Sequence, residues 1–378
     1  MFCCESGISE TRNMNRCSNR PGWGLMVTWG LLLALTPCMP AVGAETFGYT
    51  SRRPQLWETE RPVLETEPGT NLYWHDPHLA SWETCRIWPP ATNGCMPTWY
   101  AKAELLALYR DVNNDVTVNP ISPLADVDLS TADFRTDFSP GIRATVGRTL
   151  GTWYRIEGTY FGSYSWDDTA FDVVDGASID FESSLHSGEL NLRRRALMRP
   201  GQYEASFLVG GRYLDIDETF GYSADFVAPL QGIGGNSQIV QTDNSMYGVQ
   251  IGMLSQFLMQ PKCWIDFDMK GGIFTNRATL ERTYTVTADT GAILGSATSL
   301  DEIDRTSFAG ELSLQFNYQF APSWTFFAGY NALWVTGLAI AAENYDNSIP
   351  AITSGAASIN HSGEVVYHGP NIGLVFTH

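Results

Sequence analysis

Beyond its first 44 residues, this 378-residue sequence lacks any apolar run approaching the roughly 20 residues of a membrane-spanning helix. A helical membrane protein is therefore excluded. A membrane-spanning β-barrel is not, because half of each barrel strand is polar. Basic residues are also scarce, with 23 Lys and Arg against 41 Asp and Glu and a net charge of −18 at pH 7. A chain this acidic binds nucleic acid poorly, so we expect no nucleic-acid partner.

Motifs that carry catalysis are absent as well. The sequence has no G-x-S-x-G, H-E-x-x-H or phosphate-loop pattern. His186 and His361 fall near the ends of predicted strands, but no motif surrounds them. We expect that the protein is not an enzyme and uses no cofactor.

Cysteine is sparse after residue 44, where only Cys85, Cys95 and Cys263 remain. Three scattered cysteines make a poor metal site. Cys85 and Cys95 are close in sequence, and an oxidising compartment allows them to pair. We therefore predict a Cys85–Cys95 disulfide with Cys263 left over.

Residues 1–44 have the three parts of a secretory signal peptide. Three arginines form the basic region, an apolar segment covers residues 23–35, and small residues end at Ala44. We predict cleavage after Ala44. Two acidic residues precede the arginines, so Met14 is an alternative to Met1 as the start of translation.

Residues 45–97 contain seven prolines and four tryptophans and show no sustained alternation of polarity. Proline removes a hydrogen-bond donor and disfavours strands. We predict a separate segment here, either a periplasmic extension or a plug of the barrel.

Residues 98–378 alternate in polarity, most clearly over residues 308–334. Every second residue from Phe308 to Phe320 is apolar or Gly, and the alternation resumes after a turn at 321–323. Period two places alternate side chains on opposite faces of a strand, which predicts a hairpin with one apolar face. Trp324 and Trp334 share that face. Their spacing spans about 25 Å along the membrane normal, the height of an outer-membrane barrel's apolar band.

The same pattern predicts an all-β fold, an antiparallel up-and-down transmembrane β-barrel of about ten strands. Twelve strands are the alternative, because two of the long loops have room for another hairpin. Aromatic residues ten positions apart recur on three further strands. The predicted strands are 99–109, 142–148, 153–164, 184–197, 203–215, 246–257, 264–278, 308–320, 324–334 and 367–376.

The connections between these strands alternate strictly between short turns and long loops. Short periplasmic turns and long extracellular loops are typical of outer-membrane barrels. We therefore expect an outer-membrane location with both chain ends in the periplasm. The expected partners are outer-membrane lipid and the barrel-assembly machinery, and the oligomeric state is open.

Several ordered motifs resemble a known family. They are AELLALYR, GIRATVGRTLGTWYRIEGTYFG, FLVGGRYLDIDETF, NSMYGVQIG, WIDFDMKGGIFTNRA and AGYNALWVTG. Together they resemble the planctomycete-type putative β-barrel porin family, the seventh so named, over about residues 99–378. One departure begins at Gly337, where that family has a Val-x-Arg-Pro-like element. The resemblance implies an outer-membrane barrel with a porin-like role.

Fourteen charged residues fall on the inward faces of the predicted strands, seven of each sign. One interpretation is a charged constriction that selects ions. The other is a salt-bridge network that fills the barrel, which ten strands favour, because eight strands are just filled by side chains and porins have about 16. The predicted pore-lining residues are Lys102, Glu104, Arg143, Arg155, Glu157, Glu189, Arg193, Arg195, Glu204, Arg212, Asp266, Asp268, Lys270 and Glu311.

Two predicted loops are rich in acidic residues. Asp167, Asp168, Asp172 and Asp175 lie in one of them, and the other follows Asp215. Carboxylate clusters can bind calcium, which makes divalent cations possible partners of these loops. The sequence has no EF-hand-like spacing, so a solvated acidic surface is favoured over a metal site.

These patterns leave three functions open. The first is porin-like passage of small solutes or ions. The alternative is a structural or adhesion barrel with a closed lumen, acting through its acidic surface loops. A hydrolase that works through its loops ranks third.

Overall fold

The computed structural model describes residues 98–112, 115–118, 129–134, 138–151, 153–172, 176–199, 203–230, 233–346 and 358–378. The predicted signal peptide (1–44), the segment 45–97 and the Cys85–Cys95 pair lie outside these ranges. Within them, no helix has the length and apolar character needed to cross a membrane.

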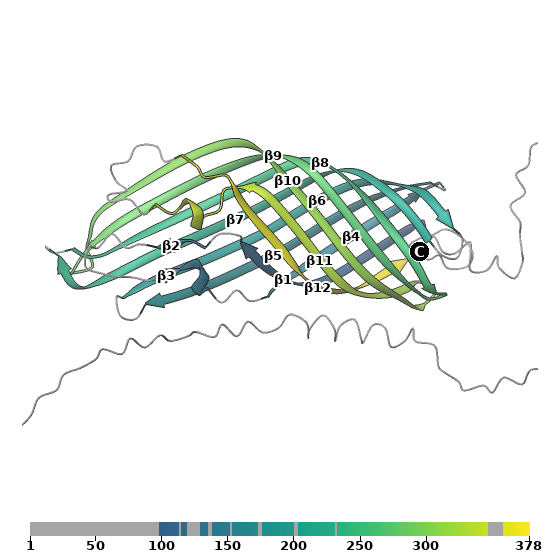
Figure 1. The fold of residues 1–378 in the computed structure, drawn as a ribbon, viewed down its shortest axis with the longest axis horizontal. Coiled ribbons are helices and arrows are strands. Elements are labelled where there is room, and N and C mark those ends of the chain that lie inside the picture. Colours follow the sequence, from purple (N-terminus) through teal and green to yellow (C-terminus); the bar gives the residue numbers. More distant parts are fainter. Residues whose placement is uncertain are drawn as a thin grey trace, which may run out of the picture.

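Ten strands close into one antiparallel barrel, in which each strand pairs with its neighbours in sequence and the first pairs with the last (Figure 1). The predicted ten-strand barrel is confirmed, and the alternative of twelve is wrong. The barrel strands are β1 (Trp99–Val112), β4 (Ser139–Leu150), β5 (Tyr154–Asp172), β6 (Ala177–Arg199), β7 (Tyr203–Leu230), β8 (Ile233–Gln260), β9 (Cys263–Ala288), β10 (Ile293–Ala321), β11 (Trp324–Leu338) and β12 (Gly363–Thr377). The short strands β2 (Thr117–Val118) and β3 (Leu129–Ser130) form a separate sheet.

The two ends of the barrel differ. At the short-turn end, connections of two or three residues join β4 to β5, β6 to β7, β8 to β9 and β10 to β11, and the end of β12 lies beside the start of β1. At the opposite, long-hairpin end, the six strands β5 to β10 continue far past the other four (Figure 1). The prediction of long loops between β5 and β6, β7 and β8, and β9 and β10 is therefore wrong. Those residues pair as strands up to connections of two to four residues at 173–176, 231–232 and 289–292.

These residues form strands because polar and apolar residues still alternate there. The apolar residues now occupy the inner face, however, and the polar residues the outer face. On β7, Phe207, Val209 and Tyr213 are exposed on the outer face. Two positions further, the outer face carries Asp215, while Leu214 and Ile216 point inward and are fully buried. Apolar side chains turn inward where the outside is water, and outward where it is lipid.

The outer surface carries an apolar band between two rows of aromatic residues. Trp324 is 41% exposed in the row near the short-turn end, and Trp334 is 48% exposed in the other row. Tyr203 packs on Phe257, and Trp324 on Phe376, each at 5.0 Å between ring centres. Rows of this kind are typical of membrane–water interfaces. Exposed residues in the band include Leu105, Ile142, Val146, Leu190, Val209, Val249, Ile251, Ile273, Leu312, Leu314 and Ile372.

The long-hairpin end has an apolar core inside the barrel. In the connection from β11 to β12, the described residues 339–346, with a short 3₁₀ turn η3 (Ala342–Asn344), fold inward and contribute to this core. Gly337 begins the inward turn with a φ of 78°, a left-handed conformation that favours glycine. Asn244 of β8 then holds Ala339 with two hydrogen bonds of 2.8 Å, one to its N–H and one to its carbonyl. A second 3₁₀ turn, η2 (Thr131–Asp133), follows β3.

Cys263 corrects another prediction. Its sulfur is disulfide-bonded, so the expectation that Cys263 is left over is wrong. The described residues contain no second cysteine, so the partner lies outside them.

Candidate functional site

The fourteen predicted pore-lining residues all lie inside the barrel. Thirteen of them make ion pairs of 2.8 to 3.8 Å with one another. The fourteenth, Asp266, accepts a hydrogen bond of 2.8 Å from the side chain of Gln256. Their position reflects the period-two alternation of their strands, which leaves the polar face inward wherever the outer face meets the apolar band.

Glu311 on β10 is the centre of the network. One carboxylate oxygen lies 2.8 Å from Arg143 on β4, and the other lies 2.8 Å from Arg212 on β7. Neither strand is a neighbour of β10, since three strands separate β10 from β4 and two separate it from β7. The chain of contacts from Arg143 through Glu311 to Arg212 therefore crosses the lumen from wall to wall.

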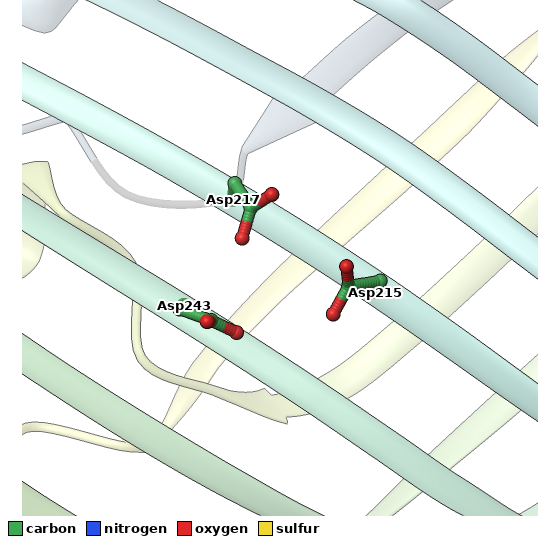
Figure 2. Close-up of side chains that lie close together, drawn as sticks. All are labelled: Asp215, Asp217 and Asp243. Carbon is green, nitrogen blue, oxygen red and sulfur yellow. The ribbon is translucent and has the colours of Figure 1, made fainter.

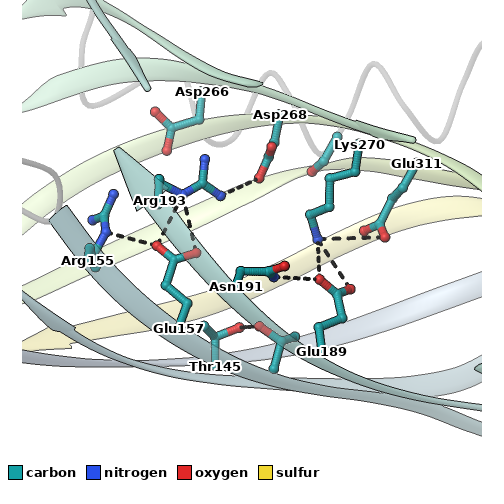
Figure 3. A network of polar contacts seen from close by, with 12 residues as sticks. Thr145, Arg155, Glu157, Glu189, Asn191, Arg193, Asp266, Asp268, Lys270 and Glu311 are labelled. Atoms are coloured by element: carbon teal, nitrogen blue, oxygen red, sulfur yellow. Dashed lines mark hydrogen bonds and ion pairs between the residues drawn. The ribbon is translucent and has the colours of Figure 1, made fainter. Parts of the chain in front are cut away.

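Glu189 on β6 extends this crossing. It pairs with Lys270 at 3.1 Å, and Lys270 in turn lies 3.8 Å from Glu311 (Figure 3). Glu189 also pairs with Arg212 at 3.4 Å. Gln250 donates to the same carboxylate at 2.9 Å. Each charge in this group is thus shared among several partners, which is how a buried ion pair satisfies its remaining donors and acceptors.

A second group lies nearer the short-turn end. Arg193 on β6 donates its Nε–H to both oxygens of Glu157 at 3.2 Å, and its terminal nitrogen reaches Asp268 on β9 at 3.4 Å (Figure 3). Arg155 pairs with Glu157 at 2.8 Å. Because β7 and β8 lie between β6 and β9, the contact from Arg193 to Asp268 also spans the lumen.

Between these two groups lies a cavity of about 70 Å³. Its lining includes Tyr100, Arg143, Arg193, Asp268 and Glu311. A water molecule needs about 10–15 Å³ of such space, so the cavity has room for a few water molecules. It has no room for a hydrated sugar or amino acid.

The sequence did not lead us to expect a buried ion pair on the long-hairpin side of this network. Arg110 of β1 pairs with Glu218 of β7 within the apolar core, and the Arg110 guanidinium stacks on Phe181 at 4.6 Å. Glu218 also accepts a hydrogen bond of 3.1 Å from the backbone N–H of Ala341. This pair therefore links the barrel wall to the inward-folded connection. The sequence could have indicated this pair. Arg110 ends the AELLALYR motif and lies an even number of residues from Glu104, so both side chains point to the same, inward face of the strand.

The acidic residues of the long hairpins take a different arrangement from the one predicted. In the part of the chain that the structure describes, Asp215, Asp217 and Asp243 are the one group of three metal-ligating side chains with atoms within 4.8 Å of one another (Figure 2). Asp167, Asp168 and Asp172 do not form such a group, and Asp175 lies outside the described residues.

The three clustered aspartates lie on the outer face of β7 and β8, just beyond the aromatic row. Partial burial and the neighbouring carboxylates of Asp215 and Asp243 raise the pKa of Asp217. The same two causes, with Asp215 as the neighbour, raise the pKa of Asp243. The cluster therefore carries mutual repulsion at neutral pH.

The two histidines considered for catalysis have separate surroundings. His186 on β6 lies 3.0 Å from the Tyr160 hydroxyl on the outer face. His361 lies 3.3 Å from the carbonyl of Ile359, next to β12. Each contact is one that a structural histidine makes.

A known protein family matches the barrel part of the chain. The family model described as Putative beta barrel porin-7 (BBP7) matches residues 169–377. A comparison with curated proteins gives no match.

Three bacterial proteins are among the solved structures that match this chain. The outer membrane protease OmpT from Escherichia coli shows 12% identity and a TM-score of 0.44, covering 74% of this chain and 96% of that chain. A deltaS2S3 mutant of the monoaromatic hydrocarbon channel TodX, a Pseudomonas putida protein, shows 7% identity and a TM-score of 0.33, and the match covers 81% of this chain and 94% of that chain. Ail, the attachment invasion locus protein of Yersinia pestis, shows 7% identity and a TM-score of 0.23, and the match covers 74% of this chain and 100% of that chain.

The closed ten-stranded barrel, its apolar outer band and its charged interior define an outer-membrane β-barrel. The match over residues 169–377 covers more than half of the chain, so the chain belongs to the Putative beta barrel porin-7 family.

Proposed function

We propose that this protein is a closed outer-membrane barrel that acts through its long-hairpin end rather than as an open pore. The observation that carries the proposal is the crossing from Arg143 through Glu311 to Arg212, which joins β4, β10 and β7 across the lumen. The apolar core above this crossing, with the inward-folded β11–β12 connection, supports closure at a second level. The barrel serves as an anchor in this proposal, without a catalytic role.

The orientation in the membrane is part of the proposal. Short turns face the periplasm in outer-membrane barrels, which places the short-turn end and both ends of the barrel there. The long hairpins then extend outside the cell with an acidic outer face. Outer-membrane lipid contacts the apolar band, and the barrel-assembly machinery inserts the chain.

Passage of small solutes or ions is the second candidate. It is favoured by the cavity between the two charged groups, whose lining carries both signs of charge. Passage requires Arg143 and Arg212 to separate from Glu311. Removing one partner of a buried pair costs about 3–5 kcal/mol, so the open state is sparsely populated unless a ligand stabilises it.

Solute uptake by proteoliposomes tests the proposal. The purified protein is reconstituted into phosphatidylcholine vesicles, and the entry of radiolabelled arabinose is compared with entry into empty vesicles and into vesicles that carry a general porin. We expect uptake equal to that of empty vesicles. Uptake approaching that of the porin vesicles refutes the closed barrel and establishes passage.

A further inference from the structure

Among the residues that the structure describes, the part of β10 at the long-hairpin end is paired on one side only. Its ladder with β9 runs from Ile293 to Tyr318, whereas its ladder with β11 begins at Phe308. The chain leaves the wall at Gly337 and folds inward, so β11 does not accompany β10 further. Within the described residues, positions 295–306 of β10 therefore form one free edge of the six-stranded sheet beyond the barrel (Figure 1).

The register shows which backbone groups face this edge. The N–H of Gln319 donates to the carbonyl of Lys262, on the β9 side, at 2.9 Å. The pairing with β9 keeps one register from Gly295 to Tyr318, so odd-numbered residues of β10 bond to β9. In an antiparallel strand the intervening residues point their N–H and C=O to the opposite side. Those directed at the free edge are Ser296, Thr298, Leu300, Glu302, Asp304 and Thr306.

The side chains of these six residues are all exposed. Leu300 is 74% exposed, and Glu302 and Asp304 follow it on the same face. Glu302 pairs with Arg277 of β9 at 2.6 Å, but both side chains are exposed, and such pairs exchange partners at little cost. The edge therefore presents an apolar position followed by two acidic ones.

We propose that this edge binds an extended segment of a partner protein by strand addition. Main-chain hydrogen bonds to the free groups of β10 supply affinity, and side chains on alternate positions supply specificity. The complementary segment carries an apolar residue opposite Leu300 and Lys or Arg opposite Glu302 and Asp304. The inference rests on the proposed function, because it names the partner of the long-hairpin end.

A second copy in the same membrane does not fit this edge. Two barrels in one membrane are related by an axis along the membrane normal. Because barrel strands tilt by about 40°, the two copies of β10 cross at about 80° instead of lying antiparallel. A flexible segment of another protein has no such constraint, so we assign the edge to a heterologous, basic, extended chain.

Binding of a synthetic peptide tests the proposal. The probe is a fluorescent, end-blocked peptide in which lysine alternates with threonine at one end and valine alternates with threonine at the other. Its binding to the intact protein in nanodiscs is followed by fluorescence anisotropy. Thr298→Pro removes a free N–H and leaves the β9 ladder intact, so we expect binding to weaken about tenfold with unchanged thermal stability.

Two comparisons isolate the edge. Ser299→Pro, one position away, removes an N–H that bonds to β9, and it should lower the thermal stability instead. The double charge reversal E302K/D304K should weaken peptide binding about fivefold. The matched reversal D180K/E182K, on β6 with neighbours on both sides, should leave binding unchanged.

Amide hydrogen exchange gives an independent readout. Without the peptide, the six even-numbered amides from 296 to 306 should exchange fast while the odd-numbered amides are protected, and the peptide should slow the even set. Protection of the even set without the peptide, no binding to the wild type, or equal binding by Thr298→Pro overturns the proposal. None of these results depends on whether the barrel admits solutes, so the two proposals fail separately.

Discussion

At the scale of single residues, Glu311 has the largest role. It is the only charged residue between positions 308 and 334, yet three cations from three other strands lie within 4 Å of its carboxylate. Taking so many charges out of water is costly, and their mutual attraction roughly offsets that cost. The network therefore adds little net stability over an apolar filling, but it makes each member hard to remove.

Glu311→Ala tests this role. It leaves Arg143, Arg212 and Lys270 without their shared partner, and we expect a loss of about 3–5 kcal/mol in the free energy of unfolding. The matched control is Glu302→Ala, which removes one half of an exposed pair with Arg277 and should cost less than about 1 kcal/mol. Urea unfolding in lipid vesicles, followed by tryptophan fluorescence, measures both. Equal losses for the two variants would contradict the buried network.

Asp217 and Asp243 give a pH-dependent prediction. Their pKa values are raised by partial burial and by neighbouring carboxylates. A raised carboxyl pKa means that the folded state holds the proton more tightly, so stability falls as pH rises through the folded pKa. Asp217→Asn removes this penalty. We expect a small gain in stability at pH 7 that vanishes below the ordinary Asp pKa of 3.8.

Thermal unfolding of the wild type and Asp217→Asn at pH 7 and pH 3 measures this gain. Asp180→Asn, on β6, serves as a control for the loss of one acidic side chain. A variant that is destabilised at pH 7 would show that the aspartates attract a counter-charge instead of repelling one another.

At the scale of elements, the strands reverse their polarity where they leave the apolar band. We assigned the apolar residues of each predicted strand to the outer face. This assignment located every barrel strand, because it is correct between the two aromatic rows. It failed beyond Tyr213 on β7, where Leu214 and Ile216 turn inward and Asp215 turns outward. The alternation itself was present in the sequence. In the sequence, only the aromatic row marks the membrane–water interface. The strand residues beyond that row were therefore predicted as loops.

Gly337→Ala tests the inward turn that ends β11. The residue has a φ of 78°, and an added Cβ would lie 2.9 Å from the Ser307 hydroxyl. We expect the free energy of unfolding to fall by about 1–3 kcal/mol, because a left-handed backbone strains a non-glycine residue. Gly158→Ala on the outer face of β5 is the control, since its Cβ would meet nothing within 4 Å. Similar effects at both positions, measured by urea unfolding, would argue against the turn.

At the scale of the whole molecule, the ten-strand topology and the side-chain parity were predictable from one sequence. The fourteen inward charges were also identifiable, since parity alone places them inside. Which charges meet across the lumen was not, because the crossing from Arg143 to Glu311 depends on strands far apart in the chain. The inward-folded connection after Gly337 was missed for the same reason, since Asn244 that holds it lies on β8.

The most direct test of a closed lumen is single-channel recording of the purified protein in planar lipid bilayers. We expect no stable openings at moderate voltage of either sign for the wild type. The control is Glu302→Ala, which changes an exposed charge and should behave like the wild type. Reproducible stepwise openings of the wild-type protein, of uniform conductance, would contradict the closed barrel.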